Sequence, residues 1–68
     1  MIQFEIDSSG QGIEVFLNAK GIDELIIYLN FIKDKQEHMH LVIGNELSEE
    51  MPTDGNTQVR HVVLRYRE

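Results

Sequence analysis

Residues 21–35 read GIDELIIYLNFIKDK, and this stretch decides the fold class. Its apolar residues recur at the i, i+3, i+4 and i+7 spacing of an amphipathic helix. The acidic residues Asp23 and Glu24 fall in the first turn and the basic residues Lys33 and Lys35 in the last, which suits both ends of the helix dipole. The sequence therefore predicts a helix over residues 21–35. The face that we expect to be buried consists of Ile22, Leu25, Ile26, Leu29 and Ile32.

The segment before this helix is typical of a β-hairpin. Over residues 1–7 the apolar side chains Ile2, Phe4 and Ile6 alternate with polar ones, which is the period of a half-buried strand. A second alternating run follows the glycine-bearing turn at residues 8–12, where glycine accepts positive φ without steric cost. The polar side chains of the first run are expected to face away from the core.

The segment after the helix predicts two more strands, over residues 38–43 and 58–67. The loop between them, residues 44–57, is longer than the two to five residues of an ordinary hairpin loop. Such a length is typical of a functional or a mobile segment.

The predicted element order is ββαββ, which indicates an α+β fold in a single domain of residues 1–68. A right-handed crossover through the helix would make the second and third strands parallel neighbours. We therefore expect a four-stranded mixed sheet with the helix packed on one face. No predicted element is left to cover the opposite face.

The composition argues against several classes of protein. Twelve acidic residues against six basic ones give a formal net charge of −6, which disfavours a nucleic-acid ligand. There is no cysteine, so neither a disulfide framework nor a thiolate zinc site can form. No apolar run approaches the roughly 20 residues of a membrane span, and the first residues lack the basic start of a secretory signal. We expect a cytoplasmic protein with no membrane or nucleic-acid partner.

Catalytic motifs are not recognisable in this sequence. Ser8, Ser9 and Ser48 lie outside any Gly-x-Ser-x-Gly elbow. The Gly10-Gln11-Gly12 stretch precedes a predicted strand instead of a helix, unlike a phosphate-binding fingerprint. We therefore expect a protein that is not an enzyme and that holds no cofactor.

The three histidines invite a metal interpretation. His38 and His40 lie on the same side of the third strand, and the expected register brings His61 to the same outer face. Three neighbouring imidazoles can in principle hold zinc with an open position for water. The alternative is three solvent-facing histidines on a polar sheet face. We favour that alternative and predict no metal site.

Two surfaces are candidates for binding. The long loop carries Glu46, Glu49, Glu50 and Asp54, and such a concentrated negative field steers a cationic partner, although a charge run kept only for solubility is the alternative.

The open sheet face is the second candidate surface. It carries Phe16 among His38, His40 and His61, and an uncovered face with apolar members suits a partner or a second copy. An unblocked edge strand would also allow a homodimer.

Four short segments of the chain resemble one known family. They are Gly21-Ile22-Asp23-Glu24-Leu25, His38-Met39-His40-Leu41, Gly44-Asn45-Glu46-Leu47-Ser48-Glu49 and His61-Val62-Val63-Leu64-Arg65-Tyr66. The pattern resembles the small immunity proteins of bacterial polymorphic toxin systems, the family numbered thirty-two in that classification. The resemblance runs over nearly the whole chain. One difference is that a tryptophan and a second glycine before Glu46-Leu47-Ser48 are absent here.

The resemblance implies a stoichiometric inhibitor that is encoded beside a toxin and protects the producing cell by binding it. Many toxins of these systems are nucleases with basic active sites, which an acidic binder can occupy electrostatically. We therefore expect a non-enzymatic protein that neutralises a cognate toxin through the acidic loop and the open sheet face. The alternative is a small self-associating domain without a toxin partner.

Overall fold

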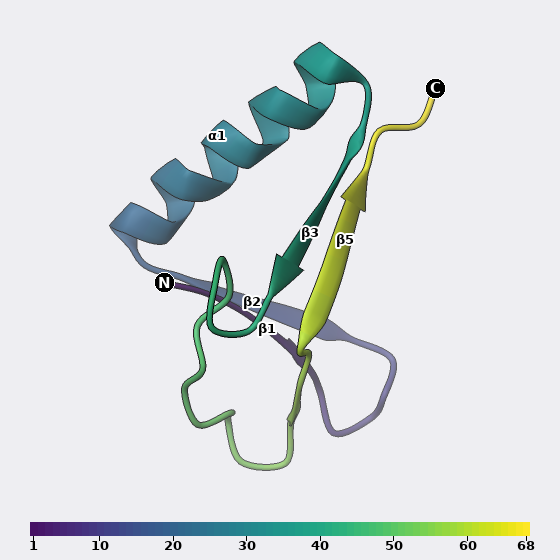
Figure 1. Ribbon diagram of the computed structural model, residues 1–68. Helices are drawn as coiled ribbons and strands as arrows, with labels where there is room; N and C mark the ends of the chain where they lie inside the picture. Colours follow the sequence, from purple (N-terminus) through teal and green to yellow (C-terminus); the bar gives the residue numbers. More distant parts are fainter.

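The computed structural model describes residues 1–68 and has an α+β fold (Figure 1). The molecule is elongated, with principal extents of 37 × 25 × 18 Å. Its elements, in chain order, are β1 (Ile2–Ile6), β2 (Ile13–Leu17), α1 (Ala19–Lys35), β3 (His38–Val42), β4 (Thr57–Gln58) and β5 (His61–Arg65).

The first two strands form the antiparallel hairpin that the alternation predicts, with Ile2 opposite Leu17 and Ile6 opposite Ile13. Its turn is built by Asp7, whose carbonyl accepts a hydrogen bond from the Gly10 amide at 2.9 Å. Gly10 has a φ of 76°, a conformation that glycine adopts without strain. The turn at residues 8–12 is therefore confirmed.

The strands divide into two sheets instead of one. A three-stranded sheet has the order β2-β1-β4, a two-stranded sheet pairs β3 with β5, and every ladder is antiparallel. The expected four-stranded mixed sheet, with the second and third strands parallel, is not observed. The crossover rule assumed that β3 would pair beside β2, but β3 takes its antiparallel partner from the C-terminal segment.

The C-terminal segment changes sheets at Arg60. The Val59 amide donates to the Phe4 carbonyl at 2.9 Å and continues the ladder along β1. One residue later, the Arg60 carbonyl accepts from the Ile43 amide at 3.2 Å, which begins the ladder with β3. The predicted strand 58–67 is thus two short strands separated by a corner, a common way for strands to pass between packed sheets.

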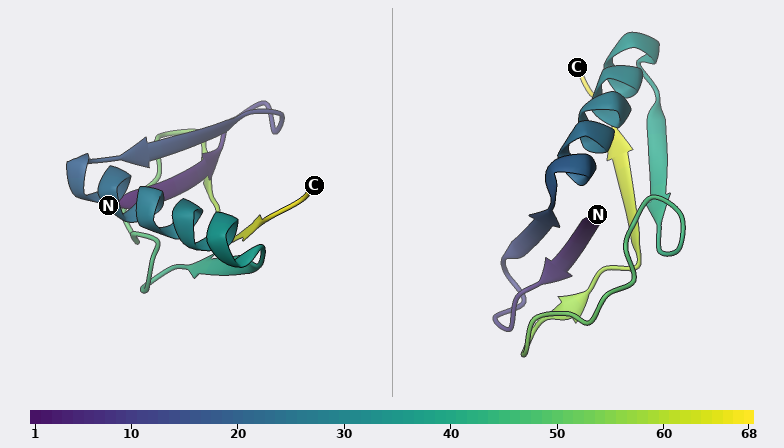
Figure 2. Two further views of the ribbon diagram at one scale, coloured as in Figure 1. Left: turned by 90° about the horizontal axis from the view of Figure 1, so that it is seen from above. Right: turned by 90° about the vertical axis from the view of Figure 1, so that its left-hand side faces the viewer.

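The helix begins at Ala19, two residues before the predicted start. Asn18 caps it, because its Oδ1 accepts a hydrogen bond from the Gly21 amide at 2.8 Å. As a result, no acidic residue lies in the first turn, whereas Lys33 and Lys35 occupy the last turn as expected. Seen from above in Figure 2, the helix lies between the β1–β2 hairpin and β3.

The helix buries a stripe that is rotated from the predicted one and shares Leu25 and Ile32 with it. Gly21 and Ile32 are buried, and Leu25 and Tyr28 pack against the core between them. The members of the predicted stripe that remain about half exposed are Ile22, Ile26 and Leu29.

Gly21 accounts for this rotation of the helix. A Cβ atom on Gly21 would lie 1.8 Å from the Met1 carbonyl oxygen, so only glycine lets the helix approach β1 this closely. This contact rotates the helix so that Gly21, Leu25, Tyr28 and Ile32 face the sheets. The hydrophobic period cannot reveal such a contact.

The core is small and sits where the two sheets meet. It is centred on Ile2 of β1, Leu41 of β3 and Leu47 of the following loop. Many large apolar side chains remain exposed on the helix and on β2, among them Ile27 and Ile13, each 65% exposed. No helix in the structure has both the length and the apolar character needed to cross a membrane.

Candidate binding loop

Residues 48–56, which we call the clamped loop, run along the polar side of β1 instead of projecting into solvent. In Figure 1 this green segment descends below the β3–β5 sheet and returns to β4. Beneath it, Gln3 is 3% and Glu5 is 2% exposed. The expectation that the face opposite the helix is uncovered is therefore wrong for the first sheet.

Gln3 holds the loop at Glu50. Its side-chain nitrogen donates to the Glu50 carbonyl at 3.2 Å, and its side-chain oxygen accepts from the Glu50 amide, also at 3.2 Å. The same nitrogen donates to Oε2 of Glu5 at 2.8 Å. A neutral side chain of β1 thus binds both backbone groups of one loop residue, much as a neighbouring strand would.

Glu5 holds the loop at Thr53 and Asn56. Its Oε1 accepts from the Thr53 amide at 3.0 Å and from the Asn56 side-chain nitrogen at 2.9 Å. Burial raises the pKa of the Glu5 carboxyl, but hydrogen bonds from Asn56, Gln3 and Thr53 outweigh that effect and hold the pKa below its ordinary value of 4.5. The carboxylate is therefore ionised at neutral pH and serves as an acceptor for the loop.

Further hydrogen bonds fix the start of the clamped loop. The Ser48 amide donates to the Ile2 carbonyl at 2.8 Å. The Gln58 side chain donates to the carbonyls of Ser48 and Glu50 at 3.3 and 3.2 Å. Hydrogen bonds thus tie both ends and the middle of the loop to the strands.

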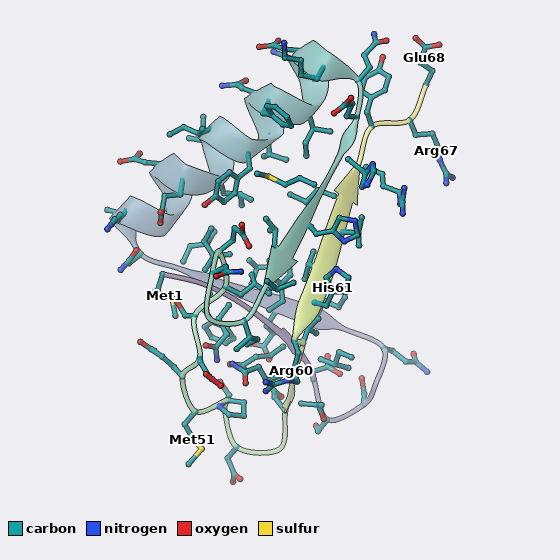
Figure 3. All side chains as sticks on the ribbon, in the orientation of Figure 1. Met1, Met51, Arg60, His61, Arg67 and Glu68 are labelled. Carbon is teal, nitrogen blue, oxygen red and sulfur yellow. The ribbon has the colours of Figure 1, made fainter.

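The clamped loop presents an exposed methionine among acids. Met51 is 92% exposed, and Figure 3 shows its side chain at the lower edge of the molecule, pointing away from the protein. Glu49, Glu50 and Asp54 are also exposed. These three predicted contact residues therefore lie together on one loop, beside an apolar side chain that the sequence interpretation did not single out.

Glu46, the fourth predicted acid, lies apart from this loop. It is half-buried in the turn after β3, and its Oε1 accepts from the Val42 amide at 3.2 Å. Burial raises the pKa of the Tyr28 hydroxyl, and the negative charges of Glu24 and Glu46 raise it further. Glu46 is thus engaged with the strand and the helix.

The three histidines share the outer face of the β3–β5 sheet, as the register argument predicts. Nδ1 of His40 and Nε2 of His61 lie 2.7 Å apart and share a hydrogen bond, and their rings stack at 5.0 Å. The ring of His38 meets that of His40 edge-on at 5.1 Å.

This geometry differs from that of a metal site. Two nitrogens bound to one tetrahedral zinc ion lie about 3.3 Å apart, which is farther than the observed 2.7 Å. No group of three or more His, Cys, Asp and Glu side chains is arranged to hold a metal ion.

Phe16 does not lie with the histidines. It pairs with Gln3 and shares the half-covered polar face of the first sheet, whereas His38, His40 and His61 belong to the second sheet. The predicted open face around Phe16 and the histidines is therefore divided between two sheets.

Comparison with protein-family models, with curated proteins and with solved structures finds no match. The function is therefore inferred from the geometry of the clamped loop, from the exposed apolar surface and from the resemblance described above.

Proposed function

We propose that this chain is a non-enzymatic binding protein that neutralises a bacterial toxin by stoichiometric binding. The observation that carries the proposal is the clamped loop, which holds Met51 in solvent between Glu49, Glu50 and Asp54. The resemblance to small immunity proteins supplies the class of partner, a toxin encoded beside this chain. We place its action in the cytoplasm of the producing cell.

A preformed loop suits tight inhibition. Ordering one residue of backbone costs about 1–2 kcal/mol, and a loop that is already held by Gln3 and Glu5 does not incur that cost on binding. The burial of Gln3 and Glu5 then has a functional reason, because these two side chains hold the binding loop in place. Without such a role, the desolvation of two polar side chains would cost free energy that a small core can hardly offset.

The chemistry of the loop suits a basic partner with an apolar recess. The exposed carboxylates attract a cationic surface and raise the association rate, and an exposed Met51 is a flexible apolar anchor. The basic active site of a nuclease offers the first of these features. The interaction surface proposed here retains Glu49, Glu50 and Asp54, adds Met51, and leaves Glu46 in a supporting position.

The test is binding to the toxin domain encoded next to this chain, recovered by co-purification and identified by mass spectrometry. Charge reversal by Glu49→Lys together with Glu50→Lys should slow association about tenfold at low salt and flatten its salt dependence. The matched control is Asp23→Lys with Asp34→Lys on the helix, which changes the net charge equally. Equal effects of the two double variants would remove the loop from the mechanism.

A variant of Met51 distinguishes apolar anchoring, which slows dissociation, from electrostatic steering, which speeds association. Met51→Ala should raise the dissociation rate and leave both the association rate and the stability of the free protein nearly unchanged, because this side chain is 92% exposed in the free protein. An unchanged dissociation rate would leave the loop with a purely electrostatic role.

A self-associating domain is the second candidate, and a specific observation favours it. The outer edge of β2 is unpaired, and its side chains Ile13 and Val15 are 65% and 43% exposed. An open edge with exposed apolar residues favours pairing with another chain. Sedimentation as a strict monomer at high concentration would count against this function.

A further inference from the structure

A groove lies between the last turns of α1 and the free side of β5. Figure 1 shows that this end of α1 and β5 lies opposite the clamped loop. The groove has a volume of about 410 Å³. Five of its eight lining residues are hydrophobic. The helix contributes Leu29, Ile32 and Lys33, and the C-terminal segment contributes residues 63–67.

One wall of this groove is an unpaired strand edge. The ladder between β3 and β5 is bracketed by two hydrogen bonds, from the Ile43 amide to the Arg60 carbonyl and from the Tyr66 amide to the Glu37 carbonyl. Backbone groups alternate in direction along an antiparallel strand. Val62 and Leu64 therefore direct their amides and carbonyls to β3, and Val63 and Arg65 direct theirs away from β3, toward the free edge.

The groove is also the basic part of an acidic protein. Lys33, Arg65 and Arg67 all line it, and none of the eight lining residues is acidic. The chain has only six Lys and Arg residues and a net charge of −6, so half of its basic residues meet at this one place. The carboxylate of Glu68 lies near the rim, where it accepts a hydrogen bond from the Tyr66 hydroxyl at 3.4 Å.

We propose that this groove binds an extended acidic peptide of a partner protein, which adds a strand to the free edge of β5. Every second backbone amide and carbonyl of such a peptide would pair with Val63 and Arg65, in the mode of β-strand addition. Apolar side chains on one side of the peptide would enter the groove beside Leu29 and Ile32. Carboxylates on its other side would meet Arg65 on the outer face of β5, within the positive field to which Lys33 and Arg67 contribute. This site is opposite in charge to the clamped loop, and it does not depend on the proposed toxin-binding function.

The probe is a fluorescently labelled peptide in which glutamate and valine alternate, titrated with the full chain and followed by anisotropy. The same peptide with lysine in place of glutamate is the charge control. Lys33→Glu should weaken binding of the acidic peptide about fivefold. Lys20→Glu, an exposed lysine at the start of the same helix, changes the net charge equally and should have a much smaller effect.

Amide hydrogen exchange locates the peptide. Binding should slow exchange at Val63 and Arg65 and leave Val62 and Leu64 unchanged, because the latter two already donate within the β3–β5 ladder. The proposal is overturned if the acidic peptide does not bind, if the lysine peptide binds equally well, or if bound peptide leaves exchange at Val63 and Arg65 unchanged. The proposal is also overturned if the chain self-associates and Lys33→Glu abolishes this self-association, because a second copy would then occupy the groove.

Discussion

Replacing Gln3 by methionine should destabilise the fold through the loss of the clamp, since methionine fills a similar volume and makes no such hydrogen bonds. The wild-type side chain makes two hydrogen bonds to Glu50 at 3.2 Å and a shorter, charge-assisted one to Glu5 at 2.8 Å. The first two are long and close to the surface, so each contributes at the low end of the usual range, and the third contributes more. We expect Gln3→Met to cost about 2 kcal/mol of unfolding free energy.

That loss is large for a domain of this size, whose single core supplies only about 3–5 kcal/mol. Urea unfolding followed by circular dichroism should therefore show a midpoint that falls by about half. The control is Gln11→Met, the same substitution at an exposed position of the β1–β2 turn, which should leave the midpoint almost unchanged. Equal midpoints for the two variants would refute the reasoning, because the buried side chain of Gln3 would then contribute nothing through the loop.

Three further predictions concern the helix start and the charge of the clamp. Asn18→Ala removes the N-cap and should lower the unfolding free energy by about 1 kcal/mol, whereas Asn30→Ala in mid-helix should not lower it. Gly21→Ala should cost about 1–3 kcal/mol despite the better helix propensity of alanine, because its Cβ would meet the Met1 carbonyl; a gain in stability would contradict that contact. The folded-state pKa of Glu5 is lowered, so its ionised carboxylate stabilises the fold above the ordinary value of 4.5, and this contribution is lost as the pH falls through the lowered pKa. The stability difference between wild type and Glu5→Gln should therefore shrink from neutral to acid pH, and a constant difference would argue against the clamp.

The regular elements were predictable because their periods are local. The alternation of β1 and β2, the turn between them and the 3.6-residue period of α1 all appear in the structure. The period predicted Leu25 and Ile32 as buried, but the rotation of the helix was not predictable, because Gly21 sets it by contact with the chain terminus. The two-sheet arrangement was not predicted, although the sequence marks the corner. The alternation changes phase at Arg60-His61, since Val59 lies at an odd position and the core-packed Val62 and Leu64 lie at even ones.

The binding loop was predictable in charge but not in structure. Its length and its acids single it out, but the partners of its backbone lie 47 and 48 positions away in β1. Alternation assigns Gln3 and Glu5 to solvent, since a buried carboxylate is unexpected unless its partners are known. A long loop in a chain whose first strand has an uncovered polar face is the one signal that points to such a cover.

The most direct test of this account is amide hydrogen exchange of the clamped loop in the free protein. The amides of Glu50 and Thr53 donate to the side chains of Gln3 and Glu5 and should exchange slowly. The reference is Met51, which lies between them and is 92% exposed, and whose amide should exchange at the rate of an open chain. Equally fast exchange at all three residues would mean that the loop is not held before binding, and it would contradict the account.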